Sequence, residues 1–213
     1  MKKLQSSLTN MVLVLVASAL VMGGILALVN HITEGPINEQ KEKSLADGIK
    51  LVMGGGELTV AANDTIVKDV DKDGKEETYI LHHANDNKGQ ALGVAVESTT
   101  QGFGGDLKIL VGFNPDGDIL GYTILETTET PGLGAKADKW FQADGKGSII
   151  GKNPEKNKLA VTKGGEGEID AITASTITSR AFLKAVNQAY SALKDKDKDT
   201  DAKTGATQKV ANQ

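Results

Sequence analysis

The sequence of 213 residues contains no cysteine. That absence excludes disulfides, thiolate zinc sites, cysteine-ligated iron–sulfur clusters and covalently attached c-type haem. Aromatic residues make up only 4% of the chain, and 24 Lys and Arg residues against 28 Asp and Glu give a net charge of −4. Proteins that bind nucleic acid usually present a basic surface and aromatic side chains that stack on bases. The composition therefore predicts no nucleic-acid partner.

One long run without charge lies near the N-terminus, from Met11 to Val29. As a helix it would be about 28 Å long, close to the hydrocarbon thickness of a bilayer. Ala17-Ser18-Ala19 has the form of a signal-peptide cleavage site, but the run is longer than a typical signal core. Lys2 and Lys3 precede it, which favours a cytoplasmic N-terminus. We expect a single-pass protein of the bacterial inner (cell) membrane with a periplasmic or otherwise extracytoplasmic domain.

After Gly35-Pro36, residues 37–52 have the apolar spacing of an amphipathic helix, which Gly54-Gly55-Gly56 should end. Short β-type segments follow, and the turn Asn114 to Asp118 predicts a hairpin between the last two. The predicted strands cover residues 65–70, 78–83, 91–98, 108–113 and 119–126.

Two further helices are predicted. Residues 136–143 include Trp140 and Phe141, which would cover the sheet, and residues 179–193 carry one apolar face. The fold class expected is α+β, an antiparallel sheet with flanking helices behind one transmembrane helix. The predicted regions are a cytoplasmic N-terminus (1–10), the transmembrane helix (11–29), a linker and amphipathic helix (30–57), the extracytoplasmic domain (58–194) and a disordered polar tail (195–213).

Several candidate sites fail simple chemical tests. The segment Asp69 to Gly74 alternates carboxylates like a calcium loop, but Ile80 stands where that loop needs a bidentate Glu. His82 and His83 would point to opposite faces of a strand, so they do not form a metal pair. No Ser-His-Asp order or nucleophile elbow is present, so a hydrolase is not supported.

Three glycine-containing stretches and one hydroxyl-rich segment remain. The stretches are Gln101 to Asp106, Glu129 to Gly134 and Lys163 to Gly167, each of which could be an ordinary tight turn. The hydroxyl-rich segment Asp170 to Ser179 directly precedes the last predicted helix. Free N–H groups at a helix N-terminus can hold a phosphate, whereas simple capping would need only one Ser or Thr.

Together, the GFGG, ETPGLG and DAITASTITS motifs resemble those of the FMN-binding domain in the G subunit of Rnf electron-transport complexes. That family is closely related to the C subunit of the sodium-pumping NADH:quinone reductase, and the resemblance covers nearly the whole chain. In this family the last Thr of a D-x-x-[ST]-G-A-T-type motif carries FMN through a phosphoester bond, which a dedicated extracytoplasmic flavin transferase installs. The resemblance implies covalent FMN on Thr176, while Ser175 offers a second hydroxyl beside it.

The resemblance also implies roles for neighbouring residues. Ala174 stands where the family usually has Gly, and Ser175 where it usually has Ala. Asp170 would assist recognition by the transferase or its metal, while Thr173 and Thr178 would support the phosphate. The loop from Glu129 to Gly134 would line the isoalloxazine ring. Within it, the resemblance implies Glu129, Thr130, Gly132 and Leu133 as cofactor-binding residues, with Thr130 as a hydrogen-bond donor and Leu133 as an apolar wall.

The function expected from the resemblance is electron transfer within an ion-translocating ferredoxin:NAD oxidoreductase complex. The expected partners are other membrane subunits of the complex, the flavin transferase and the membrane itself. Two alternatives remain at this stage: the C subunit of a sodium-translocating NADH:quinone reductase, and an anchored scaffold module in which the Thr/Ser segment only caps a helix.

Overall fold

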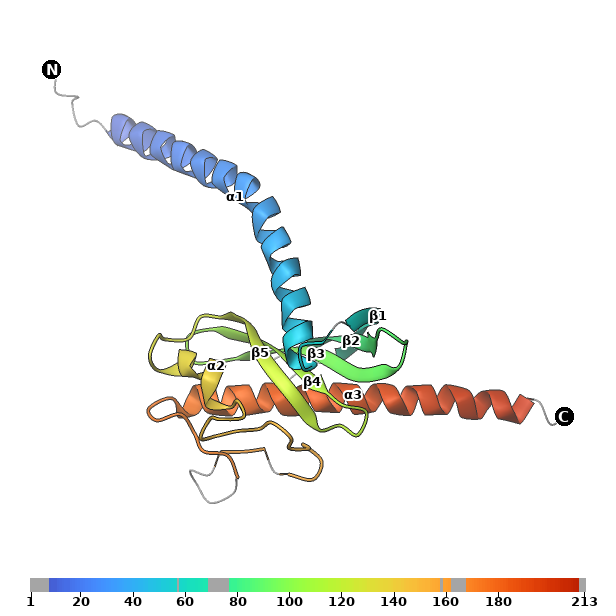
Figure 1. Cartoon of the computed structure of the whole chain (residues 1–213). Coiled ribbons are helices and arrows are strands. Elements are labelled where there is room, and N and C mark those ends of the chain that lie inside the picture. The colour runs from blue at the N-terminus through green and yellow to red at the C-terminus, as the bar shows by residue number, and fades with distance from the viewer. Residues whose placement is uncertain (1–7, 57, 69–76, 158, 162–167, 211–213) are drawn as a thin grey trace. The chain divides into compact units, whose positions relative to one another are not determined.

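The structure is a computed structural model that describes residues 8–56, 58–68, 77–157, 159–161 and 168–210 (Figure 1). The chain forms two compact units, Met1–Leu45 and Ala46–Gln213. Two motifs from the sequence analysis, the acidic segment after residue 68 and the glycines of residues 163–167, lie outside the described residues.

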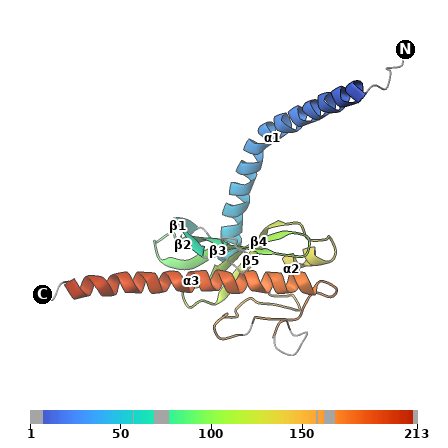
Figure 2. The same cartoon turned by 180° about the vertical axis from the view of Figure 1, so that it is seen from behind.

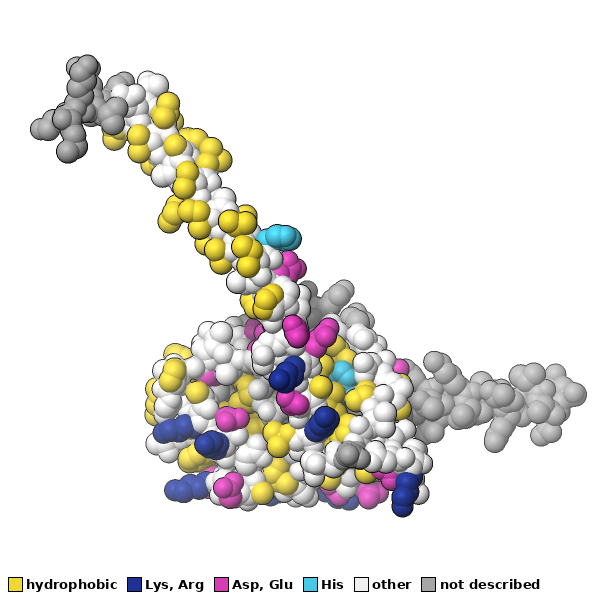
Figure 3. Space-filling view, turned by 45° about the horizontal axis from the view of Figure 1, so that its top comes forward, with side chains coloured by type: hydrophobic (Ala, Val, Ile, Leu, Met, Phe, Trp, Pro, Cys, Tyr) yellow, Lys and Arg dark blue, Asp and Glu magenta, His cyan; other side chains and the backbone are white. Residues whose placement is uncertain are grey.

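The first unit consists of most of helix α1, which runs from Leu8 to Val52. Within the described residues it is the one helix long and apolar enough to cross a membrane, and Figure 3 shows mainly hydrophobic side chains along its N-terminal part. The two helices expected at residues 11–29 and 37–52 are one continuous helix, which runs through Pro36. Proline removes one intrahelical hydrogen bond, but its fixed φ is close to the helical value, so the helix can continue.

The second unit is built on an antiparallel sheet of five strands in the order β1-β2-β3-β4-β5. The strands are β1 (Leu58–Lys68), β2 (Glu77–Asp86), β3 (Ala91–Gln101), β4 (Asp106–Phe113) and β5 (Ile119–Thr127). All five predicted strands and their antiparallel pairing are therefore confirmed, although β1 begins earlier than expected. The predicted hairpin is also confirmed, since the Asn114 and Gly117 amides bond to Asp118 O and Asn114 O, with φ +83° at Gly117.

Helix α3 (Thr176–Val210) lies across one face of this sheet, as both ribbon views show (Figures 1 and 2). Its predicted apolar face is buried, with Phe182 fully enclosed. Phe141 stacks on Phe182 with ring centroids 4.4 Å apart, and the Tyr122 ring meets Phe182 edge-on at 4.7 Å. The buried face of α3 comprises Phe182, Val186, Ala189, Tyr190 and Leu193.

Two helix boundaries differ from the sequence expectation. The predicted helix at 136–143 is a 3₁₀ turn η1 (Gly134–Lys136) followed by the short α2 (Ala137–Trp140). Helix α3 continues to Val210, past the predicted start of a disordered tail at residue 195. A helix that is already nucleated gains one hydrogen bond for each residue added, and the added stretch contains no proline.

The C-terminal end of α1 covers the opposite face of the sheet. Ile49, Val52 and Met53 are buried there. Gly112 on β4 and Gly121 on β5 are directly paired, and both lie beneath Val52. A Cβ on Gly112 would come within 2.5 Å of the Val52 carbonyl oxygen, so only glycine allows this close approach. The second unit therefore begins at Ala46, earlier than the boundary at residue 58 expected from sequence.

A row of polar side chains crosses four strands on the same face as the end of α1. The His82 ring nitrogens lie 2.8 Å from Asn63 Oδ1 and 2.7 Å from Glu97 Oε1. Lys108 Nζ lies 2.6 Å from the other Glu97 oxygen. Burial raises the pKa of Glu97, but hydrogen bonds from His82 and Lys108 outweigh it and leave the pKa below its ordinary value.

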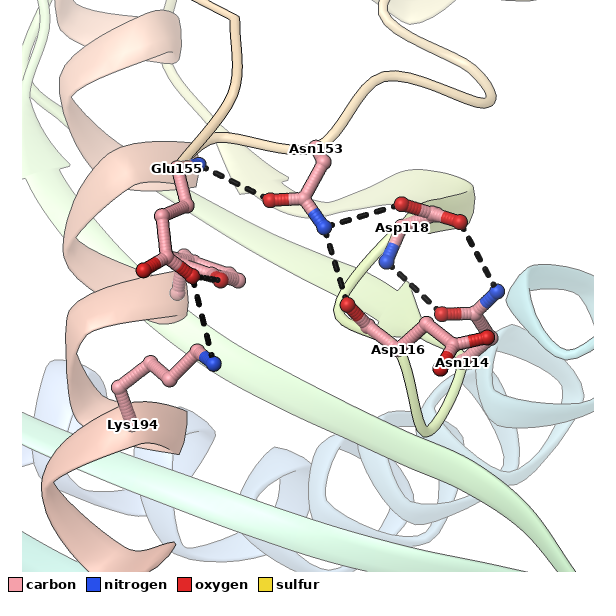
Figure 4. Close-up of polar contacts among 7 residues, drawn as sticks. Asn114, Asp116, Asp118, Asn153, Glu155 and Lys194 are labelled. Atoms are coloured by element: carbon pink, nitrogen blue, oxygen red, sulfur yellow. Dashed lines mark hydrogen bonds and ion pairs between the residues drawn. The ribbon is translucent and has the colours of Figure 1, made fainter. Parts of the chain in front are cut away.

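The hairpin between β4 and β5 is held by the loop that follows α2 (Figure 4). Asn153 Nδ2 donates to the Asp116 carbonyl at 3.0 Å and to Asp118 Oδ1 at 2.9 Å. Two residues further on, Glu155 accepts a hydrogen bond from Tyr190 of α3 at 2.9 Å. These hydrogen bonds therefore join the hairpin, the loop and α3.

Candidate functional site

Three segments that are distant in the sequence meet around one pocket of about 380 Å³. They are the turn between β3 and β4, the loop after β5 and the first turn of α3. The pocket is lined by Phe103, Glu129, Thr130, Leu133, Gly134, Ala174, Ser175, Thr176, Ile177 and Thr178. Each segment comes from a motif that the sequence analysis singled out.

Glu129 lies at the centre of these segments and is 7% exposed. Its Oε1 accepts hydrogen bonds from the backbone N–H of Phe103 at 2.6 Å and of Gly104 at 3.4 Å. Its Oε2 accepts a hydrogen bond from the Thr178 hydroxyl at 2.9 Å. We call Glu129, the two amides and this hydroxyl the Glu129 cluster. Both carboxylate oxygens of Glu129 are engaged within the protein.

The loop after Glu129 has the local chemistry of a type II turn. Pro131 follows Thr130, Gly132 has φ +77°, and the Leu133 amide donates to the Thr130 carbonyl at 3.1 Å. Proline and a glycine with positive φ at the two central positions are typical of this turn. The turn places Thr130 and Leu133 in the pocket lining, whereas Gly132 supplies only the turn geometry.

The Ser and Thr residues at the start of α3 differ in their exposure and in their hydrogen bonds. The Ser175 carbonyl accepts hydrogen bonds from the Ser179 amide and hydroxyl, at 3.0 and 2.9 Å, and Ser175 itself is 8% exposed. Thr178 is 1% exposed and its hydroxyl donates to Glu129. Thr176 is half-buried and opens on the pocket. Since Thr176, Ile177 and Thr178 begin the helix, their backbone N–H groups lack intrahelical acceptors.

Ala174, directly before this turn, has φ +62°. It is the one non-glycine residue with positive φ in the described part of the chain. This conformation is costly for a residue with a Cβ atom. The structure thus gives a physical reason for the glycine that the resembling family usually has at this position.

Asp170 is held by a different contact. The Trp140 indole N–H donates to the Asp170 carbonyl at 2.8 Å, and the Asp170 side chain is exposed. Neither Asp170 nor Thr173 lines the pocket. Trp140 therefore fixes the backbone at the start of the hydroxyl-rich segment, while the Asp170 carboxylate remains accessible from outside.

Most residues expected at the site are brought together by the structure. Glu129, Thr130, Leu133, Ala174, Ser175, Thr176 and Thr178 line the pocket, whereas Asp170, Thr173 and Gly132 do not. The sequence analysis did not name Phe103, Gly134 and Ile177 as site residues. Phe103 and Gly134 lie in motifs that had been noted, and an apolar residue next to the expected acceptor was the available signal for Ile177.

The pocket lining combines exposed apolar side chains with polar residues. Phe103, Leu133 and Ile177 are 68%, 42% and 57% exposed, so their apolar surfaces are available to a bound group. The polar residues of the lining are Glu129, Thr130, Ser175, Thr176 and Thr178. None of the described side chains that line the pocket is Lys or Arg. These features fit a flat apolar ring attached to a single phosphate at the helix N-terminus.

The comparisons with known proteins agree with this geometry. The sequence profile of the FMN-binding domain family matches residues 102–191, a range that contains all three pocket segments. The chain is 34% identical to the G subunit of the Na(+)-translocating ferredoxin:NAD(+) oxidoreductase complex of Acetobacterium woodii over 183 residues, covering 82% of this chain and 86% of that protein.

Two further relatives have similar coverage. The G subunit of the proton-translocating ferredoxin:NAD(+) oxidoreductase complex of Clostridium ljungdahlii is 30% identical over 82% of this chain and 85% of its own length. The G subunit of the ion-translocating oxidoreductase complex of Shewanella baltica is 32% identical over 80% and 82%, respectively.

Proposed function

Because the chain belongs to the G-subunit family of Rnf-type, ion-translocating ferredoxin:NAD oxidoreductase complexes, we propose that it is their membrane-anchored electron carrier with FMN esterified to Thr176. FMN accepts one or two electrons, so it supplies redox chemistry to a chain without cysteine. The relatives described above are all named as G subunits, which favours this assignment over a quinone-reductase subunit.

The choice of Thr176 rests on its exposure and its place in the pocket, compared with the neighbouring Ser and Thr residues. Ser175 is 8% exposed and lies directly before α3, and Thr178 is 1% exposed and donates to Glu129. Thr173 does not line the pocket. Thr176 combines a half-buried position, a place in the pocket wall and adjacent free helix N–H groups. These properties favour Thr176 over Ser175 as the attachment point.

The electrostatics of the pocket favour covalent over reversible binding. A site for free FMN would normally pair the phosphate with Arg or Lys. The described lining of this pocket contains a carboxylate, Glu129, and no basic side chain. Helix N–H groups and hydroxyls can stabilise the single charge of a phosphodiester. A dianionic free phosphate would have less support, so we infer that the ester bond retains the flavin.

The attachment step has a simple atom balance. Condensing an alcohol with free phosphate in water is unfavourable, so the donor must carry an activated phosphate, as a flavin dinucleotide does in its pyrophosphate. The Thr176 Oγ–phosphorus bond forms, the bond from phosphorus to the bridging oxygen breaks, AMP leaves and the Thr176 hydroxyl loses its proton. The chain orients the hydroxyl at the start of α3, and a flavin transferase supplies the activated donor.

Mass spectrometry of the full chain purified from membranes tests this proposal. We expect a mass increase of one FMN minus one water on the tryptic peptide Gly164–Arg180, with fragment ions that place it on Thr176. Thr176→Val should carry no flavin, while the matched variant Ser175→Ala should retain it. An unmodified native peptide after expression with the transferase, or flavin retained by Thr176→Val, would contradict the proposal.

We also propose how the chain is oriented in the membrane. The two lysines before α1 favour a cytoplasmic N-terminus, which places the flavin domain outside the cytoplasm, where it would meet the transferase and the other membrane subunits. Because the chain has no cysteine, single cysteines can report the topology. In spheroplasts, Ala143→Cys should react with a membrane-impermeant maleimide, and Ser6→Cys should react only after lysis. The reverse pattern would contradict this orientation.

A further inference from the structure

We propose that Glu129 is a positioning residue for flavin attachment, which acts by fixing the pocket walls and does not contact the reacting atoms. This inference rests on the proposed function, because it concerns the same attachment to Thr176. Its basis is the Glu129 cluster, in which one carboxylate joins three segments of the chain.

The first observation is that both carboxylate oxygens are used within the protein. Oε1 holds the turn that carries Phe103, and Oε2 holds the Thr178 hydroxyl. Thr178 is two residues after Thr176 in the first turn of α3. The contact therefore fixes the helix turn that presents the acceptor hydroxyl relative to the aromatic side chain across the pocket.

The second observation concerns the glycines of the two motifs. A Cβ on Gly102 would lie 2.2 Å from Glu129 Oε1, and a Cβ on Gly134 would lie 2.4 Å from Glu129 Oε2 and 2.8 Å from Thr178 Oγ1. Real Cβ atoms do not approach other atoms so closely. Gly102 and Gly134 thus make room for the carboxylate. The close packing of both motifs is explained by Glu129 without a direct flavin contact.

The consequence for attachment follows from geometry. The acceptor oxygen must approach the phosphorus atom of the donor along a narrow range of directions, and small displacements in such steps lower rates strongly. Without the carboxylate, the amides of the Phe103 turn and the Thr178 hydroxyl would each lose a buried acceptor. Both walls of the pocket would then be free to move relative to Thr176.

Substitution by glutamine separates positioning from a direct chemical role. In Glu129→Gln, Oε1 can still accept from the Phe103 and Gly104 amides, and Nε2 can donate to Thr178 Oγ1. The cluster would keep its shape without its charge. If Glu129 removed the Thr176 proton or bound a metal ion of the transferase, glutamine would fail as completely as leucine. Thr178→Ser and Thr178→Val form a second pair, which keeps or removes the hydroxyl.

The experiment uses the full apo-chain in detergent with a flavin transferase and flavin adenine dinucleotide, and follows attached flavin fluorescence on denaturing gels. We expect Glu129→Gln and Thr178→Ser to react within about threefold of the native rate, and Glu129→Leu and Thr178→Val to be slower by about tenfold or more. The KM for the dinucleotide should stay unchanged while kcat falls, because the dinucleotide is bound by the transferase. In fully loaded Glu129→Leu, flavin fluorescence anisotropy should fall.

Two results would overturn the inference while leaving the proposed function intact: Glu129→Gln as slow as Glu129→Leu, or Thr178→Ser as slow as Thr178→Val. A native rate in Glu129→Leu would overturn it as well. The intrinsic fluorescence of Trp140 checks that each variant is folded, and the Thr178 pair provides the test if Glu129→Leu does not fold. Failure of the native chain to accept flavin, or normal loading of Thr176→Val, would instead refute the proposed function and this inference together.

Discussion

Replacing Gly112 with alanine should displace the end of α1 from the sheet. The new Cβ would lie 2.5 Å from the Val52 carbonyl oxygen, which belongs to the backbone and cannot rotate away. Overpacking of this kind typically costs about 1–3 kcal/mol if the surroundings adjust. Full release of Ile49, Val52 and Met53 would cost about 1.5–3 kcal/mol for each buried side chain. Because full release would cost more than local adjustment, we expect Gly112→Ala to lower the free energy of unfolding by about 3 kcal/mol, the upper end of the overpacking range.

The assay is urea unfolding of the full apo-chain in detergent, followed by the fluorescence of Trp140, the only tryptophan. This probe reports on the second unit and is insensitive to the membrane helix. Gly56→Ala is the matched control, because a Cβ added at Gly56 would have no atom within 4 Å. It should change stability by less than about 0.5 kcal/mol.

Gly121→Ala provides a graded comparison, since its Cβ would lie 3.1 Å from Val52 atoms. It should be destabilised less than Gly112→Ala. If Gly112→Ala unfolds at the same urea concentration as Gly56→Ala, the end of α1 does not pack on the sheet as described, and the reasoning is refuted.

Three further predictions concern single residues. Ala174→Gly should raise the free energy of unfolding, measured by urea titration, by about 0.5–1 kcal/mol. The relief of the left-handed backbone at φ +62° outweighs the greater freedom of glycine in the unfolded chain. A lower stability of the variant would contradict the strain argument. Tyr122→Phe should lower the free energy of unfolding by about 1–3 kcal/mol, measured in the same way. The Tyr122 hydroxyl donates to the Ala137 carbonyl at 2.6 Å and accepts from the Phe141 amide at 3.3 Å, and both bonds would be lost. The folded pKa of Glu97 lies below its ordinary value of 4.5, so its ionised form stabilises the fold above that pH and the contribution is lost as pH falls through the folded pKa. The stability difference between the native chain and Glu97→Gln should therefore narrow in urea titrations from pH 7 toward pH 3, and a constant difference would refute the assignment.

Local patterns in the sequence predicted the parts of the fold that depend on local physics. Short β-type runs separated by turn residues identified all five strands, and the helical spacing of Phe182, Val186 and Ala189 identified the buried face of α3. The hairpin at Gly117 followed from turn chemistry alone. These features depend on residues close together in the chain, so a single sequence contains the information needed to find them.

Features that depend on distant contacts were not predictable in this way. Glu129 bonds to residues 26 and 49 positions away in the chain, and nothing in its neighbourhood indicates those partners. The burial of Val52 depends on glycines of β4 and β5, so the domain was predicted to begin too late. The continuation of α1 through Pro36 conflicts with the usual effect of proline on a helix. In the candidate site, motifs indicated the region and Thr176, whereas only the tertiary structure shows that Ser175 and Thr178 are more buried than Thr176.

The absence of basic side chains from the described pocket lining has a consequence for how long the carrier works. If only an ester bond retains the flavin, a photodamaged or oxidised ring cannot be replaced by a fresh molecule from solution. The useful lifetime of the prosthetic group then equals that of the polypeptide. Renewal of redox capacity would require synthesis, membrane insertion and enzymatic loading of a new chain, so turnover of this protein would limit repair of the whole assembly.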